Sequence, residues 1–263
     1  MVVKADTEDL KVRFKMAAAD SLDGQAKYAE ARPKYLAIFK DHAKHVLAAD
    51  ALYFASFAAF QLKQYDAVLG DAAEFEKQFP EHDFAADVAK LVEESRVLKS
   101  VDLFKAEKFT ETIELLSAVV ANSPKGNRTA ESLLLLARSQ ARLEKYEDAK
   151  ASLGKLISGF PENNLVPESI YRLGEYHFVA NDFDGAITQF TTVIDKYADT
   201  SFAKQSVGRR ADVKFEKGRK QLADKQVDEA IATWNSILTE VEDYRLAHAV
   251  LYEVAFALRS QDK

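Results

Sequence analysis

A short residue pattern recurs along this chain at only two spacings. An aromatic or branched residue lies three positions before a smaller one, and successive pairs are 37 or 44 residues apart. Because seven residues make about two helical turns, the longer spacing preserves the same helical face. So restricted a set of spacings indicates an internal repeat. The pairs are Tyr28 with Ala31, Tyr65 with Val68, Phe109 with Thr112, Tyr146 with Ala149, Phe183 with Ala186, and Val227 with Ala230.

Each repeat is predicted to be two helices joined by a turn. An apolar residue follows each pair by four positions on the same helical face, and Pro80, Pro124 and Pro161 stand where second helices end. The chain has only 9 Gly and 5 Pro, which favours helix. We predict second helices near 26–40, 65–79, 109–122, 146–159, 183–197 and 226–240. We predict first helices near 8–22, 48–63, 84–106, 128–143, 167–180 and 201–223, and a solitary last helix near 245–260.

Two expectations concern the limits of the array. Pro33 falls inside the earliest second helix, so we expect that helix to begin later or to kink. Residues 1–263 contain no linker or low-complexity segment, so we expect a single continuous superhelical domain. The last helix carries Tyr252, Phe256 and Leu258 and is apolar for a cap. We therefore expect a fragment of a longer protein.

The residues at 170–190 resemble a known repeat family. The run from Ile170 to His177 has the form I-x-x-L-G-x-x-H, and an A-x-x-x-F run follows at 186–190. This order is similar to the tetratricopeptide repeat, which prefers Trp where Ile170 stands and Tyr where His177 stands. The resemblance implies an all-α fold, an α-α solenoid. It implies a right-handed superhelix of about six antiparallel helix pairs plus the solitary C-terminal helix.

The repeat length resembles one subgroup of that family. The unit here is 37 residues where the family standard is 34, and the extra residues lie in the loop after Pro161. That longer loop, with phrases such as those at 76–80 and 195–197, is similar to a bacterial cell-envelope subgroup. The subgroup includes the Tol-Pal coordinating protein and the lipoprotein of the outer-membrane protein assembly machine. It implies a periplasmic or outer-membrane associated protein, with a cytoplasmic location as the alternative.

Composition excludes several kinds of chemistry. With no cysteine there is no thiolate nucleophile and no cysteine zinc site. The net charge of −6 gives no overall attraction for nucleic acid, and no run of 18 apolar residues predicts a transmembrane segment. His42 and His45 could begin a zinc site, but a third ligand is not evident. Because no catalytic motif is present, we expect no enzyme activity, no cofactor and no metal.

The first helices are expected to line a concave groove that binds a protein or peptide partner. The resemblance implies that two residues of each first helix face the concave side, the second lying one or two helical turns after the first. Aromatic side chains and Arg are favoured binding anchors. The alternative is that these rings pack between neighbouring helices. The predicted groove residues are Tyr53, Phe57, Phe60, Phe104, Arg138, Arg142, Tyr171, Phe178, Phe215, Arg219, Tyr252 and Phe256, with Glu94, Glu131 and Glu175 as polar companions.

A second candidate surface is a stripe of cations on the long helix 201–223. At about 100° per residue, five of its basic side chains fall in one sector of the helix. The stripe could steer an acidic partner or polyanion, and the alternative is a solvated face. Its residues are Arg209, Arg210, Lys214, Lys217 and Lys220.

The two longest predicted helices, 84–106 and 201–223, lie 118 residues apart. At the same offset Phe84 aligns with Phe202 and Tyr53 with Tyr171. This indicates a higher-order repeat of three units. We expect two matching ridges, available for self-association or for docking a partner.

These observations together predict a non-catalytic protein–protein interaction scaffold in a bacterial cell-envelope assembly. The alternative from another class is a glycan-binding or glycan-acting helical repeat protein, which would require two close carboxylates beside aromatic rings.

Overall fold

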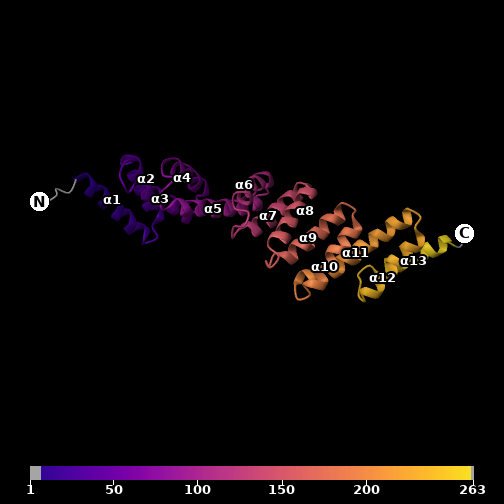
Figure 1. The fold of residues 1–263 in the computed structure, drawn as a ribbon. Helices are drawn as coiled ribbons and strands as arrows, with labels where there is room; N and C mark the ends of the chain where they lie inside the picture. Colours follow the sequence, from indigo (N-terminus) through magenta and orange to yellow (C-terminus); the bar gives the residue numbers. More distant parts are fainter. Residues whose placement is uncertain (1–6, 262–263) are drawn as a thin grey trace. The chain divides into compact units, whose positions relative to one another are not determined.

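The computed structural model describes residues 7–261, and all regular secondary structure in that range is α-helical (Figure 1). The predicted all-α class and its helix pairs are confirmed. We call the odd-numbered helices A helices and the even-numbered ones B helices. The helices are α1 (Thr7–Asp23), α2 (Tyr28–Asp41), α3 (Ala48–Gln61), α4 (Tyr65–Gln78), α5 (Ala85–Lys105), α6 (Phe109–Asn122), α7 (Thr129–Arg142), α8 (Tyr146–Gly159), α9 (Val166–Val179), α10 (Phe183–Lys196), α11 (Ser201–Ala223), α12 (Val227–Glu240) and α13 (Ala247–Gln261).

The chain divides into two compact units. Met1–Asn122 carries α1 to α6, and Ser123–Lys263 carries α7 to α13. Within each unit, short turns join helices that pack side by side in sequence order (Figure 1). Each A helix contacts its own B helix, and each B helix contacts the next A helix of the same unit. Each unit is therefore a stack of helix pairs with mostly local contacts.

The helix bounds lie within two residues of the predicted ones, with one correction at Pro33. Helix α2 begins at Tyr28 and continues through Pro33, so the proline does not delay the start of the helix. Pro33 lies on the exposed side and removes only one backbone donor. Ala31, Tyr35 and Ile38 are buried on the other side. Their packing holds the helix across the missing hydrogen bond.

Every turn from an A helix to its B helix contains one residue whose backbone φ is positive, in the left-handed helical region. The N–H of the next residue donates to a carbonyl five positions back, at 2.9 Å from Gln64 to Ala59 and from Lys145 to Gln140. This contact satisfies a carbonyl at the end of the A helix. None of the left-handed residues is glycine, although a Cβ is costly there. They are Ala26, Lys63, Glu107, Glu144, Asn181 and Lys225, with φ between 56° and 64°.

Each A helix from α1 to α11 has a buried small residue sixteen positions before a buried residue of its B helix. In two of these pairs the small residue is glycine. A Cβ added to Gly174 would lie 2.9 Å from Cε1 of Phe190, and one added to Gly218 would lie 2.6 Å from Cε2 of Trp234. The helices of these two pairs therefore approach more closely than alanine allows. The equivalent small residues, all buried, are Ala19, Ser56, Ser100 and Ala137.

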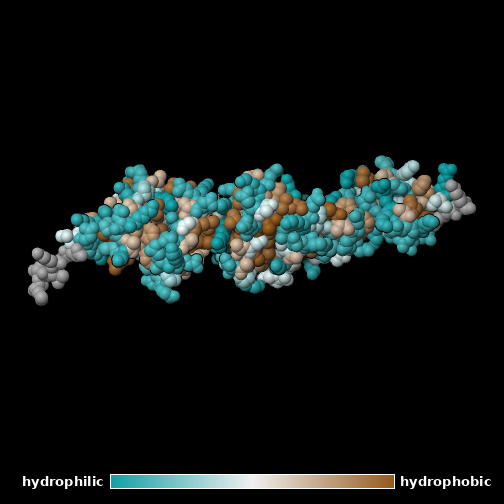
Figure 2. Space-filling model, turned by 90° about the horizontal axis from the view of Figure 1, so that it is seen from above, coloured by the Kyte–Doolittle hydropathy of each residue, from teal (hydrophilic) through white to brown (hydrophobic). Residues whose placement is uncertain are grey.

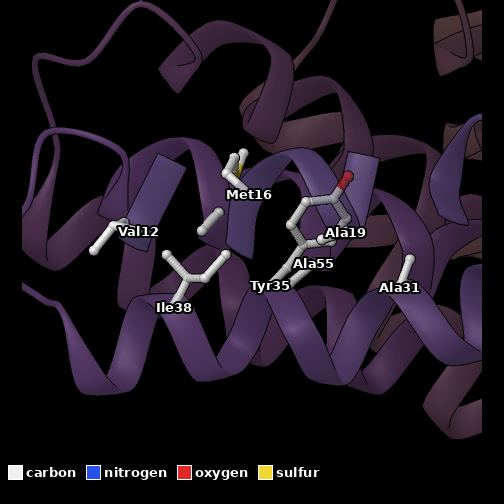
Figure 3. Close-up of a cluster of buried hydrophobic side chains, with 8 residues drawn as sticks. Val12, Met16, Ala19, Ala31, Tyr35, Ile38 and Ala55 are labelled. Carbon is white, nitrogen blue, oxygen red and sulfur yellow. The ribbon is translucent and has the colours of Figure 1, made fainter. Parts of the chain in front are cut away.

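The first helix pair shows how a repeat core is built. Tyr35 of α2 is buried among side chains of α1 and α3 (Figure 3). Its hydroxyl donates to Oδ1 of Asp20 at 2.8 Å, so the ring is buried without losing its polar partner. Burying one such large apolar side chain contributes about 1.5–3 kcal/mol. The rest of the cluster is Val12, Met16, Ala19, Ala31, Ile38, Ala51 and Ala55.

The two A helices predicted to be long are confirmed. Helix α5 has 21 residues and α11 has 23, whereas α3, α7 and α9 have 14 each. In the first unit the ring of Tyr53 stacks on Phe84, just before α5, with centroids 4.2 Å apart. In the second unit the rings of Tyr171 and Phe202 are 5.7 Å apart. The 118-residue offset thus relates equivalent ring contacts in the two units.

Candidate functional site

Three predicted groove aromatics pack across the turns between A and B helices. They are Phe60, Phe104 and Phe178. Each ring contacts the first residue of the following B helix, five positions later. Phe178 also lies under the guanidinium of Arg209, whose Cζ is 5.4 Å from the ring centroid. These rings contribute to packing as the alternative interpretation expected, although each keeps a partly exposed edge. The centroid distances are 6.4 Å for Phe60 and Tyr65, 5.4 Å for Phe104 and Phe109, and 6.1 Å for Phe178 and Phe183.

The predicted groove tyrosines are half-buried between successive repeats. Tyr53 contacts Phe84, and Tyr171 contacts Phe202. Burial raises the pKa of both phenols, so each hydroxyl stays neutral at physiological pH. Phe57 lies edge-on to Tyr28, with ring centroids 6.3 Å apart. These side chains show only part of their surface to a partner.

The remaining predicted groove residues of α7 and α11 differ in exposure. Phe215 is half-buried, and its carbonyl oxygen accepts a hydrogen bond from Nε1 of Trp234 at 3.1 Å. Arg138 is half-buried and Arg142 is exposed. Arg219 is 55% exposed and lies 3.4 Å from a carboxylate oxygen of Glu216 on the same helix. Arg142 and Arg219 are therefore the accessible part of this face.

The basic stripe of α11 is largely paired with carboxylates. Arg210 and Lys214 both reach Glu240, at 3.1 and 2.6 Å. Lys217 pairs with Asp184 of α10. Lys220 is exposed and pairs with Asp224 at 2.5 Å. Much of the positive charge is thus compensated within the fold, and Arg210, Lys214 and Lys217 link α11 to α10 and α12.

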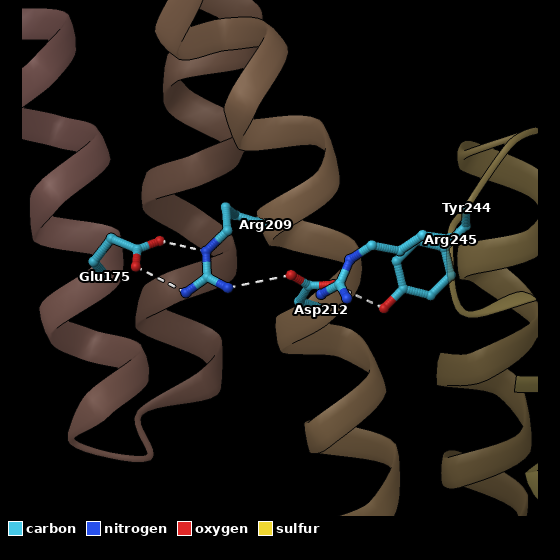
Figure 4. A network of polar contacts seen from close by, with 5 residues as sticks. All are labelled: Glu175, Arg209, Asp212, Tyr244 and Arg245. Carbon is cyan, nitrogen blue, oxygen red and sulfur yellow. Dashed lines mark hydrogen bonds and ion pairs between the residues drawn. The ribbon is translucent and has the colours of Figure 1, made fainter. Parts of the chain in front are cut away.

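Arg209, the fifth residue of the stripe, belongs to a polar network that the sequence analysis did not identify (Figure 4). Its Nε and Nη2 donate to the two carboxylate oxygens of Glu175, at 2.7 and 2.8 Å. Asp212 accepts from Arg209 at 3.2 Å, and from Tyr244 and Arg245 at 2.9 Å each. Burial and the hydrogen bond to Asp212 raise the pKa of Tyr244. The network links α9, α11 and the segment before α13.

Helix α13 carries the most exposed apolar side chains among the predicted groove residues. Tyr252 is 70% exposed and Phe256 is 55% exposed. They lie one helical turn apart on the same face, and Leu251 and Leu258 of the same helix are also exposed. On the face seen in Figure 2, apolar side chains lie among predominantly hydrophilic ones. A group of large exposed apolar residues on one helix is typical of an interaction surface.

The histidines that suggested a metal ligand have other partners. His45 Nε2 lies 3.0 Å from Oδ1 of Asp9, and its Nδ1 accepts the backbone N–H of Leu47. His42 Nε2 lies 2.9 Å from Nζ of Lys15. No group of three or more His, Asp or Glu suited to a metal is found within residues 7–261.

The carboxylates beside aromatic rings in the second unit are also held by neighbours. Glu175 accepts both hydrogen bonds from Arg209, and Asp212 is the acceptor at the centre of the network. Both carboxylates thus already have their hydrogen-bond donors within the fold. This pair therefore gives no support to the glycan-acting alternative.

Comparison with protein-family models identifies the repeat. Two models of the tetratricopeptide repeat match the chain, at residues 131–163 and 171–252. The chain therefore contains tetratricopeptide repeats, a class of scaffold that is generally non-catalytic and generally mediates protein interactions. A search of curated proteins gave no significant match. No helix in the described range is both long and apolar enough to cross a membrane.

Solved structures share the kind of helical array. MamA 41-end from Desulfovibrio magneticus RS-1 is 21% identical, covering 73% of this chain and 97% of that chain, with a TM-score of 0.41. A tetratricopeptide repeat protein from Parabacteroides merdae is 9% identical, covering 94% and 98%, with a TM-score of 0.44. PilW, a type IV pilus biogenesis factor, is 14% identical, covering 94% and 100%, with a TM-score of 0.41. Likeness at this level concerns the fold alone.

Proposed function

We propose that this chain is a non-catalytic scaffold that binds a segment of a partner protein on the surface of its A helices. The tetratricopeptide repeats support the class of function. The side chains of α13 support the place of contact in the second unit. In each unit the half-buried aromatic rings of the A helices give a partner apolar edges to cover.

The observation that carries the proposal is the pair formed by Tyr252 and Phe256. Most other predicted groove rings contact neighbouring residues of the fold, but these two are more than half exposed. Two aromatic residues one turn apart provide a large apolar contact with few rotatable bonds, which is typical of binding hot spots. An amphipathic helix or an extended segment with apolar side chains is the matching partner.

The setting that we propose is a bacterial cell-envelope assembly. The 37-residue repeat with its long loop after the B helix supports a periplasmic or outer-membrane associated protein. A cytoplasmic scaffold is the alternative. Osmotic-shock fractionation of the source bacterium, with an antibody against this chain, distinguishes the two. Release with periplasmic markers or fractionation with outer membranes would support the envelope setting, and retention with cytoplasmic markers would contradict it.

Quantitative capture from an extract of the source organism tests the proposed contact. The baits are the native chain, a Tyr252→Ala, Phe256→Ala variant, and a control Leu143→Ala, Val179→Ala variant. The control residues are exposed apolar residues at A–B turns of the same unit. We expect a partner retained by the native chain and the control but depleted about tenfold by the Tyr252, Phe256 variant, because each lost hot spot costs more than about 1 kcal/mol. Equal retention by all three baits would contradict the proposed contact.

A further inference from the structure

Two loops of the first unit carry a histidine that accepts a backbone hydrogen bond. His45 lies between α2 and α3, and the N–H of Leu47 donates to its Nδ1 at 3.1 Å. His82 lies between α4 and α5, and the N–H of Phe84 donates to its Nδ1 at 3.2 Å. In each loop the donor is the residue just before the next A helix. We call His45 and His82 the loop histidines.

The other ring nitrogen of each loop histidine faces the preceding A helix. Because a backbone N–H only donates, Nδ1 must carry a lone pair, so the proton of the neutral ring lies on Nε2. Nε2 of His45 lies 3.0 Å from Oδ1 of Asp9 on α1. Nε2 of His82 lies 3.4 Å from Oδ1 of Asp50 on α3. Each loop histidine therefore links two successive A helices through its two nitrogens.

Protonation removes one of these two links. An imidazolium carries a hydrogen on both nitrogens, so Nδ1 no longer accepts the backbone N–H. The link to the carboxylate is kept, because an opposite charge nearby favours the charged ring. Imidazole ordinarily titrates at about pH 6.5. In acid each ring therefore stays on the preceding A helix and releases the backbone just before the next one.

The surroundings of the two loop histidines differ in charge. The rings of Phe75 and Phe84 lie beside His82, with centroids 5.8 and 5.6 Å from the imidazole. Around the loop of His45 the side chains are charged or titratable. Besides Asp9 they are Arg13, Lys15 and Glu8 of α1 and His42 of the same loop. The permanent charges around this loop thus lie on α1, the helix that the protonated ring keeps.

The second unit carries a non-titrating version of the first loop. At the 118-residue offset that relates the two units, His45 corresponds to Asn163. Oδ1 of Asn163 accepts the N–H of Leu165, again two positions later, at 2.9 Å. The loop backbones match as well, because at His45 and at Asn163 the N–H donates to the carbonyl three positions back and the carbonyl accepts from the N–H three positions on. An amide oxygen makes this turn contact without titrating.

The loop of His82 has a non-titrating equivalent too. At the same offset His82 corresponds to Thr200. Oγ1 of Thr200 accepts the N–H of Ala203, in the first turn of α11, at 3.2 Å. A hydroxyl oxygen also accepts without titrating near neutral pH. Of these four equivalent side chains, only the two histidines of the first unit belong to a type that ordinarily titrates near neutral pH.

We propose that acid releases the backbone at the start of α3 and of α5 from the loop histidines and leaves the matching loops of the second unit unchanged. The joints between helix pairs of the first unit are then held by the carboxylate links and by apolar packing alone. The first unit is thereby the pH-sensitive part of the scaffold.

The joint at His82 is in contact with a residue predicted to line the groove. Phe84, which donates to His82, also stacks on Tyr53 with ring centroids 4.2 Å apart. Release of the Phe84 backbone therefore loosens a ring contact on the A helices of the first unit. This change does not depend on the partner contact proposed at α13, which lies in the second unit.

Amide hydrogen exchange of the full chain, followed by NMR at about pH 7.5 and about pH 5.5, on either side of the ordinary titration of imidazole, tests the proposal. Protection factors, corrected for the intrinsic exchange rate at each pH, are compared for Leu47, Phe84 and, as the internal control, Leu165. We expect the protection of Leu47 and Phe84 to fall about fivefold at the lower pH, as the loss of one hydrogen bond implies. The protection of Leu165 should stay the same.

The matched variants are His45→Asn and His82→Asn, which copy the acceptor of Asn163. Circular dichroism checks that each variant is folded. His45→Asn should make the protection of Leu47 independent of pH and leave the acid response of Phe84 in place. His82→Asn should do the reverse. Each variant therefore controls for the other and for carboxylates that titrate elsewhere in the chain.

Three results would overturn the proposal. Equal protection of Leu47 and Phe84 at both pH values in the native chain removes it. A fall at Leu165 as large as that at Leu47 shows that the response does not come from the imidazoles. An acid response of Leu47 that persists in His45→Asn, or of Phe84 that persists in His82→Asn, assigns the response to another group.

Discussion

Trp234 lies directly against Gly218, with its indole nitrogen donating to the Phe215 carbonyl oxygen at 3.1 Å. A methyl group on Gly218 would overlap the indole, whereas one on Gly208 of the same helix would meet nothing within 4 Å. We expect Gly218→Ala to lower the free energy of unfolding by about 1–3 kcal/mol, and Gly208→Ala to raise it by up to about 1 kcal/mol. Urea unfolding of both variants measures the difference. Equal effects would contradict the close packing of α11 on α12.

The left-handed residues of the A–B turns make a second prediction. Glu144 and Lys63 are exposed and have φ of 59° and 57°. A Cβ in this conformation costs about 1–2 kcal/mol. Replacement by glycine removes this cost, but the greater freedom of glycine in the unfolded chain cancels part of the gain. We expect Glu144→Gly and Lys63→Gly each to raise the free energy of unfolding by about 0.5–1 kcal/mol. Glu144→Val should lower it. Thermal or urea unfolding would show whether glycine instead destabilises these turns, which would contradict the turn geometry.

A third prediction concerns Arg209 and Glu175. The two side chains are about 30% exposed and share two parallel hydrogen bonds. Bidentate geometry is the case in which a partly exposed ion pair stabilises a fold measurably. We expect a double-mutant cycle with Arg209→Ala and Glu175→Ala to give a coupling free energy of about 1 kcal/mol.

The control cycle uses Arg219 and Glu216, which are 55% and 42% exposed and 3.4 Å apart. Its coupling should be below about 0.5 kcal/mol. A larger coupling in the control than in the bidentate pair would contradict the structural role of the network.

Acid should weaken the start of α10. Asp182 is the N-cap of α10. Its Oδ1 accepts a hydrogen bond from the Gly185 N–H at 2.9 Å, and its Oδ2 lies 2.7 Å from Nδ1 of His177. The hydrogen bond from the Gly185 backbone has the largest effect and the one with His177 the next largest, and together they hold the pKa of Asp182 below its usual value. A lowered folded-state pKa means that the stabilisation is present above the unfolded pKa of about 3.9 and is lost as pH falls through the folded pKa.

The comparison that isolates this effect is native chain against Asp182→Asn, which keeps a capping oxygen without the charge. Unfolding free energies are measured between pH 6 and pH 2.5. The native chain should lose stability relative to the variant below about pH 4. Asp182→Ala should cost about 1 kcal/mol near neutral pH through the lost cap. Parallel pH profiles for the native chain and Asp182→Asn would contradict a charged cap.

The sequence predicts the helices well because each recurring residue pair lies within the helix that it predicts. The pairs beginning at Tyr65, Phe109, Tyr146 and Phe183 start their B helices at the predicted residue. Helix α2 runs through Pro33, because the burial of Tyr35 and Ile38, a tertiary effect, outweighs the local preference of proline. The close contact of Gly218 is signalled by its sixteen-residue spacing to Trp234, the chain's one tryptophan.

The candidate site was less predictable because exposure depends on neighbours distant in sequence. Phe60 and Phe178 have the spacing of inward residues, yet the residue five positions later decides how much of each ring is covered. The charge run of α11 is visible in the sequence, but the carboxylates of Glu175 and Glu240 that compensate it lie on other helices. Asp212 was visible only as one of two acidic residues on a basic helix. Its three donors come from α11 and from the segment before α13.

Site-specific photo-crosslinking tests the central claim, that α13 is the contact for a protein partner. A benzoylphenylalanine replaces Tyr252, Phe256 or, as the exposed control, Val179, and the source organism is irradiated while it grows. We predict discrete adducts with one partner protein from positions 252 and 256, and none of that mass from position 179. Adducts from position 179 alone, or no adduct from either ring position, would contradict the claim.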